Sequence, residues 1–272
     1  MNSFGPRRRR SNNGVLFLAL VVALVAARLS KEPEQPPESS NTAVSTPVTN
    51  PIEDLLRPAA TVQGREGTVA AILIDTSGSM EDRVRDVDGT RRPKIDIARR
   101  SALDLVNQFD RYAKEHADQT IFLGIYEFSD RGGQCCREVI KLGPAGASDP
   151  ERVQSAISRM RPKGGTPIGD AMIQAKREMD ATGLSRRHLL VITDGENNQG
   201  YSPTDVARVI TGQTEKDRAS LYFVAFDIAA EKFNSVRDAG GLILAASNET
   251  ELKSTLDYVL TGKILAEQPA GR

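Results

Sequence analysis

The hydrophobic positions between residues 67 and 265 alternate between strand-like runs and helix-like spacing. Val69–Ile74 is a continuous apolar run, which is typical of a parallel strand covered on both faces. Lys94–Tyr112 instead repeats apolar residues every three or four positions, as an amphipathic helix does. Further strand patterns occur at 120–128, 188–193, 221–226 and 242–246, and helical patterns start near 150, 168, 203, 231 and 249. This order predicts an α/β fold: a doubly wound, mostly parallel sheet with helices on both faces and Glu138–Leu142 as an antiparallel edge strand.

The first 30 residues have the pattern of an export segment. Four arginines at positions 7–10 precede Gly14–Ala27, a stretch without a polar side chain. A basic leader before an apolar stretch leaves the N-terminus in the cytoplasm and sends the following chain outside the membrane. Fourteen helical residues reach only about 21 Å of the roughly 30 Å hydrocarbon core, whereas Ser11–Leu29 would span about 28 Å. Two expectations stay open: a retained single-pass membrane anchor, and a signal cleaved near Ala27 that releases a secreted protein.

Residues 31–66 have the composition of a linker. Six of the chain's 14 prolines lie there, among Ser, Thr, Asn and Glu. Such a segment cannot bury enough apolar surface to fold alone, and its prolines keep it extended. We therefore expect a stalk that carries a domain over residues 67–265, followed by a tail at 266–272. Ile52–Leu56 is the part of the stalk that could pack on the domain.

The formal net charge of zero is the sum of two unlike parts. Residues 1–28 contain five arginines and no acid, so the rest of the chain has 31 basic and 36 acidic side chains, a net charge of −5. Because nonspecific nucleic-acid binding needs a basic surplus, this balance excludes nucleic acid as a partner.

The cysteine content argues against both a disulfide framework and a structural zinc site. The two cysteines, Cys135 and Cys136, are adjacent, and the chain has only His116 and His188 besides. We interpret the cysteine pair as two small side chains at the border of a loop and a strand, with a vicinal disulfide as the alternative.

Oxygen-bearing side chains lie at the edge where a doubly wound sheet binds its ligands. The first strand ends in DTSGS at 75–79, and a later strand ends in TDG at 193–195. A third segment, GGTP at 164–167, stands at a helix start. Hydroxyl and carboxylate oxygens suit a hard divalent cation such as Mg²⁺. Each segment also has a plainer alternative, as a turn or, for Thr166, as a helix N-cap.

These three segments, in this order and spacing, resemble the metal ion-dependent adhesion site of von Willebrand factor A (vWA) domains, and the resemblance covers about residues 67–265. It implies that Ser77 and Ser79 bind the metal through their hydroxyls and that Thr166 binds it directly or through water. Asp75 and Asp194 would hold metal-bound waters and orient the serines. One coordination position would stay open for an acidic side chain of a partner protein. Mg²⁺ is the expected ion, with Mn²⁺ or Ca²⁺ as alternatives.

Charged and polar residues beside these segments are candidates for a partner-binding rim. The charged loop 81–93 is not an EF-hand, because alignment on its glycine places Val84 and Ile95 at the first and twelfth ligand positions. The rim residues would help to select the partner, or else be ordinary solvated residues. They are Asp86, Asp88, Glu196 and Asn197.

Together these features predict an exported, divalent-cation-dependent protein-binding domain with a role in adhesion or assembly, and not an enzyme. Its partners would be a protein ligand and, through the apolar segment, a membrane. The alternatives are a phosphoesterase-like hydrolase that uses Asp75 and a metal-free structural scaffold. Ser77 argues against the hydrolase, because it stands where a second aspartate would serve as general acid.

Overall fold

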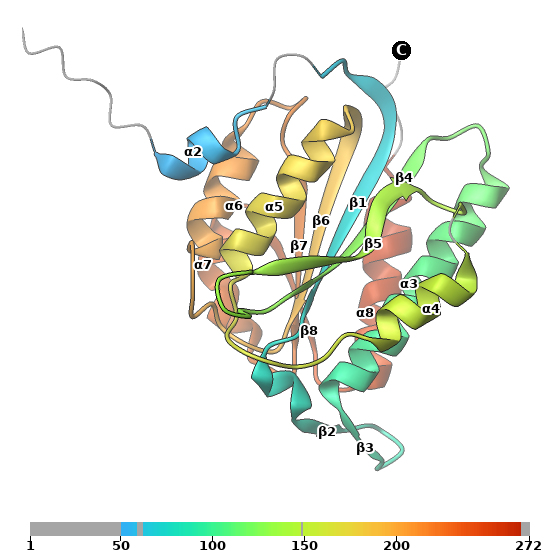
Figure 1. Cartoon of the computed structure of the whole chain (residues 1–272), viewed down its shortest axis with the longest axis vertical. Helices are drawn as coiled ribbons and strands as arrows, with labels where there is room; N and C mark the ends of the chain where they lie inside the picture. The colour runs from blue at the N-terminus through green and yellow to red at the C-terminus, as the bar shows by residue number, and fades with distance from the viewer. Residues whose placement is uncertain (1–49, 59–61, 148, 268–272) are drawn as a thin grey trace, which may run out of the picture. The chain divides into compact units, whose positions relative to one another are not determined.

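A six-stranded sheet is the centre of the computed structural model, which describes residues 50–58, 62–147 and 149–267 (Figure 1). The strand order is β5-β4-β1-β6-β7-β8, and neighbours are parallel except for the antiparallel pair β4–β5. The predicted α/β fold with an antiparallel edge strand is therefore confirmed. The strands are β1 (Arg65–Asp75), β4 (Ile121–Phe128), β5 (Cys136–Pro144), β6 (Leu184–Thr193), β7 (Ser220–Phe226) and β8 (Leu242–Ala246).

Helices cover both faces of this sheet (Figure 1). One face carries α3 (Lys94–Glu115), α4 (Pro150–Ser158) and α8 (Glu249–Val259), and the other carries α5 (Ile168–Ala181), α6 (Pro203–Gly212) and α7 (Asn234–Asp238). Successive residues of β1 alternate between the two cores, so that Ile72 packs with the first set of helices and Leu73 with the second. Both side chains are fully buried, which explains why the strand is a continuous apolar run.

Two of the expected helices are divided in the structure. The pattern at 231–238 becomes the 3-10 helix η3 (Ala230–Phe233) followed by α7, and the pattern at 249–265 becomes α8 followed by the π-helical turn η4 (Leu260–Ile264). In each case the apolar face stays on the core, with Phe233 and Ile264 both buried. The periodicity therefore located these elements without specifying their hydrogen-bond pattern.

A small hairpin replaces the loop that the sequence predicts at 81–93. After the 3-10 helix η2 (Gly78–Glu81), β2 (Arg83–Arg85) and β3 (Arg91–Pro93) pair antiparallel. The turn between them includes Gly89, whose φ of 80° is rarely adopted by other residues. The hairpin is hard to recognise in the sequence because its strands are three residues long and mostly charged.

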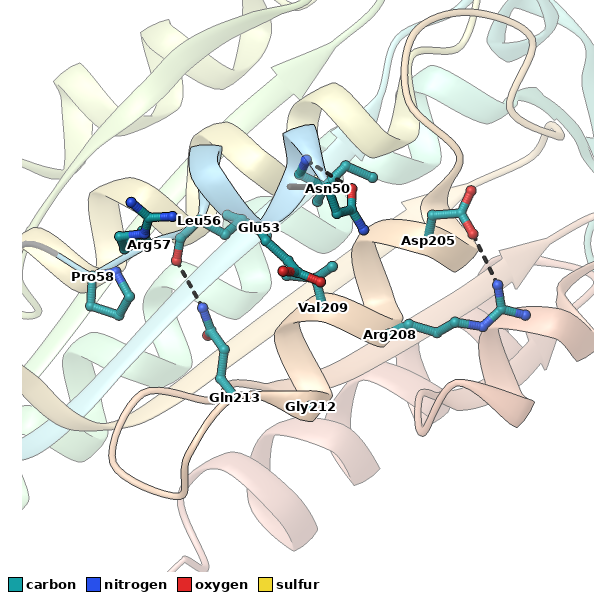
Figure 2. Close-up of a pocket in the computed structure, with 11 residues that line it drawn as sticks. Asn50, Glu53, Leu56, Arg57, Pro58, Asp205, Arg208, Val209, Gly212 and Gln213 are labelled. Carbon is teal, nitrogen blue, oxygen red and sulfur yellow. Dashed lines mark hydrogen bonds and ion pairs between the residues drawn. The ribbon is translucent and has the colours of Figure 1, made fainter. Parts of the chain in front are cut away.

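A short helix, α2 (Pro51–Leu55), lies within the segment predicted as a stalk and packs on the domain. Asn50 caps it by accepting a hydrogen bond from the Ile52 amide at 3.1 Å. Ile52 and Leu56 are buried. Gln213 Nε2, just after α6, donates to the Leu56 carbonyl at 2.8 Å, beside a groove of about 710 Å³ between the two helices (Figure 2). The expected packing of Ile52–Leu56 is confirmed.

The predicted anchor at 1–30 and the stalk residues 31–49 lie outside the described residues. Of the predicted tail, only 266–267 are described. Across the ranges that the structure covers, no helix combines the length and the apolar character needed to span a membrane.

Cys135 and Cys136 are joined in a vicinal disulfide at the start of β5. The interpretation of this pair as two unlinked small side chains is therefore wrong, and the alternative holds. Adjacency in the sequence could not decide between the two, because bonding of neighbouring sulfurs depends on the local backbone conformation.

Candidate functional site

The carboxyl ends of β1 and β6 bring the first candidate residues together. The two strands are parallel neighbours, so Asp75 at the end of β1 and Thr193 at the end of β6 reach the same edge of the sheet. Asp75 Oδ2 accepts a hydrogen bond from Thr193 Oγ1 at 2.6 Å, and its Oδ1 accepts one from the Ser77 amide at 2.7 Å. Asp75 is fully buried, so both of its oxygens are held from within the domain.

The two serines continue this cluster toward Asp194. Ser77 Oγ lies 3.1 Å from Ser79 Oγ, and Ser79 Oγ donates a hydrogen bond to Asp194 Oδ1 at 2.7 Å. The 3-10 helix η2 begins directly after Ser77, and this tight bend of the chain keeps the two hydroxyls together. The two serines therefore link Asp75 to Asp194, through the Ser77 amide on one side and the Ser79 hydroxyl on the other.

Thr166 reaches the cluster from a separate loop. The Gly78 amide donates to the Gly164 carbonyl at 3.0 Å, which ties the Thr166 loop to the serine turn. A Cβ added to Gly195 would lie 3.5 Å from Thr166 Oγ1 and 3.9 Å from Ser79 Oγ. The absence of a side chain at Gly195 thus leaves space beside the hydroxyls of Thr166 and Ser79.

Burial makes Asp75 an unfavourable place for an unbalanced negative charge. Loss of solvent raises its pKa to about 7, and the charge of Asp194 adds to the rise, although hydrogen bonds from Thr193 and Ser77 oppose it. Among the described residues, no cationic side chain pairs with Asp75 within 4.0 Å. A cation bound beside this cluster would supply the missing positive charge.

The oxygen donors of this cluster fit a hydrated divalent cation. Within the described part of the chain, no three His, Cys, Asp or Glu side chains group closely enough to hold a metal by themselves. Two carboxylates and three hydroxyls are the donors here, and Mg²⁺ accepts such a set because it keeps several of its own waters. The donors are Asp75, Ser77, Ser79, Thr166 and Asp194.

The sequence matches one protein family over the segment that contains all five of these donors. Residues 70–196 match the family model of the von Willebrand factor type A domain. Over this segment the chain is similar to vWA domains, and the fold of the structure is vWA-like. A curated relative, the uncharacterised protein YwmD of Bacillus subtilis (strain 168), is 24% identical over 204 residues, which cover 71% of this chain and 85% of that protein.

Solved structures share the fold of this vWA-like domain. The pilus adhesin SpaC from Lactobacillus rhamnosus GG, in its open conformation, matches with a TM-score of 0.56 and 15% identity over 74% of this chain and 30% of that chain. The PilB minor pilin from Streptococcus sanguinis has a TM-score of 0.56 and 13% identity over 76% and 64% of the two chains. A von Willebrand factor type A protein from Catenulispora acidiphila has a TM-score of 0.55 and 21% identity over 75% and 44%. The chain thus spans less than two thirds of each of these structures.

A buried lysine that the sequence patterns did not single out adds a positive charge to the site. Lys94, the first residue of α3, is only 5% exposed, and its Nζ lies 3.0 Å from Asp194 Oδ2 and 2.9 Å from Asp227 Oδ2. Burial alone would lower the pKa of Lys94, but the hydrogen bonds to Asp227 and Asp194 outweigh it and hold the pKa above its usual value. The Lys94 ammonium group therefore pairs with Asp194 and Asp227, and not with Asp75.

Two sequence patterns could have revealed this lysine and its second partner. Asp227 directly follows strand β7, so the rule that points to Asp75 and Asp194 points to it as well. Lys94 stands four positions before the buried Ala98 on the core face of α3, where lysine is rare unless it is paired.

Two of the rim candidates shape the hairpin. Asp86 Oδ1 accepts a hydrogen bond from the Thr250 hydroxyl at 3.2 Å, and its Oδ2 lies 3.5 Å from Arg92. Asp88 accepts from the Thr90 amide at 2.7 Å, which lowers the pKa of Asp88, and its Oδ2 lies 3.4 Å from Arg92. Both carboxylates are thus engaged within the domain.

The other two rim candidates follow β6. Asn197 Oδ1 accepts from the Ile168 amide at 2.8 Å and so closes the first turn of α5, while Thr166 makes no capping hydrogen bond. The alternative of Thr166 as a plain helix cap is therefore wrong. Glu196 is exposed and pairs with Lys232 at 2.9 Å.

Proposed function

We propose that this vWA-like domain binds a divalent cation and, through that cation, a partner protein. The observation that carries the proposal is the convergence of three separate chain segments on one space lined by Ser79 and Thr166, with Asp75 and Asp194 behind it. The raised pKa of the buried Asp75 supports a cation there, because the carboxylate lacks a cationic partner of its own.

Each residue has a distinct task in the proposed site. The hydroxyls of Ser77, Ser79 and Thr166 would bind the ion, and Asp75 and Asp194 would hold its waters and orient the serines. When bound, the cation offers an open position to an anionic oxygen, for which an acidic side chain of the partner is the proposed occupant. Mg²⁺ is the proposed ion, with Mn²⁺ or Ca²⁺ as alternatives, since all three take oxygen ligands.

We propose a role in adhesion or assembly rather than catalysis. Two of the structures with this fold are described as a pilus adhesin and a minor pilin, which supports a binding role. The position of Asp75 opposes the hydrolase alternative, because the side chain is fully buried and both oxygens already accept hydrogen bonds. A hydrolytic role would need a carboxylate that can reach a substrate.

The proposed location is the outer side of the cytoplasmic membrane. The basic and apolar pattern of residues 1–30 would leave the N-terminus in the cytoplasm and hold the domain outside on its stalk, or release it after cleavage near Ala27. External protease should remove the domain from intact cells, after disruption of any outer envelope, if this location is right. Protection of the domain until the cytoplasmic membrane is lysed would contradict it.

Calorimetry of the purified full chain tests cation binding directly. We expect Mg²⁺ to bind at about one site, and Ser77→Ala and Ser79→Ala to weaken binding at least tenfold, because each removes a hydroxyl that would bind the ion. Ser101→Ala is a matched control for Ser77→Ala, since both serines are buried but Ser101 lies on α3. Folded wild-type protein that gives no binding heat and no shift in melting temperature with Mg²⁺, Mn²⁺ or Ca²⁺ would leave only the metal-free scaffold.

Partner capture tests the second half of the proposal. Crosslinking on intact cells, with and without EDTA, should retain a partner protein only when divalent cation is present, and Ser79→Ala should abolish that retention. Capture that persists unchanged in EDTA would contradict a cation-mediated contact.

A further inference from the structure

The hairpin β2–β3 presents three arginines on one face. Along β2, Arg83 and Arg85 are exposed while Val84 between them is 7% exposed, so the strand has an outer and an inner face. Arg91 of β3 stands directly opposite Arg85 in the antiparallel register, and opposite residues lie on the same face. We call the outer surface formed by Arg83, Arg85 and Arg91 the arginine face.

The arginine face has no anionic partner in the described residues. None of its three guanidinium groups lies within 4.0 Å of a carboxylate, although Glu81 and Asp82 directly precede the hairpin. Arg83 and Arg91 donate instead to each other's backbone carbonyls, at 3.2 and 3.3 Å.

The inner face of the same hairpin is organised in the opposite way. Arg92, opposite Val84, lies within 3.6 Å of carboxylate oxygens of Asp86, Asp88 and Glu249. Like charges placed directly opposite each other, as Arg85 and Arg91 are, destabilise a strand pair. The hairpin thus neutralises its inner arginine and leaves the outer three available to an external anion.

The hairpin is inserted between two elements of the candidate cation site. It follows η2, which carries Ser79, and it precedes Lys94, whose Nζ contacts Asp194. The Lys94 amide donates to the Asp82 carbonyl at 2.9 Å, which holds the base of the hairpin to the start of α3. Figure 1 shows β2 and β3 at the same end of the sheet as the carboxyl end of β1, with η2 between them. A chain segment bound at the cation would therefore pass close to the arginine face.

We infer that the arginine face binds acidic side chains of the same partner segment whose carboxylate reaches the cation. This inference rests on the proposed function and gives the partner a chemistry: an exposed stretch with several Asp or Glu residues, not one isolated acid. Guanidinium groups form paired hydrogen bonds with carboxylates, and such rim charges speed association and select among partners. Outside residues 1–28 the chain has a net charge of −5. An acidic segment would therefore be attracted to the arginine face, where the local charge is positive.

A labelled peptide tests the inference on the purified full chain. The probe is a fluorescein-labelled peptide of alternating Gly and Glu, with a Gly and Gln peptide as its neutral counterpart, measured by anisotropy in Mg²⁺. We expect the triple variant Arg83→Gln/Arg85→Gln/Arg91→Gln to bind the Glu peptide about tenfold more weakly, because it removes three exposed positive charges that each contribute modestly. The triple variant Arg111→Gln/Arg152→Gln/Arg177→Gln, which removes three exposed arginines from α3, α4 and α5, is the matched control.

Several outcomes would overturn the inference. It fails if the Gln peptide binds as well as the Glu peptide, if the hairpin variant binds the Glu peptide like wild type, or if the control variant loses as much affinity. It also fails if wild type does not bind the Glu peptide but binds vesicles of phosphatidylcholine and phosphatidylglycerol more tightly than the hairpin variant does. The arginine face would then bind a lipid surface.

Calorimetry separates this inference from the proposed function. The hairpin variant should bind Mg²⁺ like wild type and melt at a similar temperature, because its arginines contact none of the five proposed ligands. Loss of Mg²⁺ binding in that variant would overturn the separate role of the arginine face. Absence of Mg²⁺ binding in wild type would instead defeat the proposed function, even where Glu-peptide binding still depends on the arginines.

Discussion

Replacing Asp75 by asparagine separates the cost of a buried charge from its use in cation binding. The asparagine Oδ1 can accept from the Ser77 amide as the carboxylate does. Its Nδ2 can donate to Thr193 Oγ1, whose own proton can turn to the Gly195 carbonyl 3.0 Å away. The hydrogen bonds can therefore be rearranged without loss, and the main effect of Asp75→Asn is the removal of a charge.

The Asp75 charge is unfavourable in the cation-free domain. Its folded pKa of about 7 lies above the ordinary value of 3.8, so the folded protein keeps a proton that the unfolded chain releases. This preference contributes stability that is fully present below pH 3.8 and is lost as the pH rises through 7. About three pKa units at roughly 1.4 kcal/mol each amount to a loss of about 4 kcal/mol by pH 8.

Urea denaturation in EDTA measures this loss. Between about pH 5 and pH 8, we expect the unfolding free energy of Asp75→Asn to gain about 3 kcal/mol relative to wild type, because below about pH 7 the folded wild type still holds the Asp75 proton that its unfolded chain has released. At a Mg²⁺ concentration a hundred times its Kd, the unfolding free energy of wild type should rise by about 2.7 kcal/mol, and that of the variant should rise little. Asp104→Asn is the control, because its side chain is 49% exposed on α3. Its unfolding free energy should change with pH and with Mg²⁺ as that of wild type does.

Two results would refute this reasoning. The first is a difference in unfolding free energy between Asp75→Asn and wild type that stays constant from pH 5 to pH 8 in EDTA. It would mean that Asp75 is already ionised in the cation-free protein, or that another charge neutralises it. Equal stabilisation of variant and wild type by Mg²⁺ would mean that the cation does not use Asp75.

Three further predictions concern the rest of the domain. Lys94→Met should lower the stability of the cation-free protein by about 3 kcal/mol, because it leaves two carboxylates unpaired. The same change should tighten Mg²⁺ binding in calorimetry, since Asp194 loses its competing cation, and weaker binding would count against this. Burial lowers the pKa of His188 to about 4 despite the Glu267 carboxylate 3.3 Å from its Nε2, so the unfolded chain binds a proton between about pH 6.5 and 4 that the folded domain rejects. Stability should therefore fall by roughly 3 kcal/mol as the pH decreases across that window, and His188→Gln should remove most of the fall in thermal melts. Leu56→Ala should cost about 2–4 kcal/mol in urea denaturation if α2 unfolds together with the domain, whereas Leu55→Ala, at a position 36% exposed, should cost less than about 0.5 kcal/mol.

The strands, the main helices and the clustering of Asp75, Ser77, Ser79 and Asp194 could be predicted from the sequence. Burial on two faces leaves a continuous apolar run such as Val69–Ile74, and that run marks a central strand without any neighbour being known. Once the strands are parallel, their carboxyl ends share an edge, so Asp75 and Asp194 had to approach each other.

Other features depended on contacts that no local pattern encodes. The hairpin β2–β3 has a single buried residue on β2, Val84, so there is no alternation long enough to recognise. Lys94 is held by Asp194 and Asp227, which lie 100 and 133 positions away in the sequence. The cysteine bond depends on backbone geometry rather than on spacing.

The position of Asp75 on β1 also determines how the domain would carry tension. The strand begins at Arg65, on the side of the stalk segment, and ends at Asp75, in the proposed cation site. From Thr68 onward it is paired with β4 on one side and β6 on the other. A pull between the stalk and a partner held at the cation would thus run along the central strand and load both ladders in shear, with their hydrogen bonds sharing the force instead of opening one at a time.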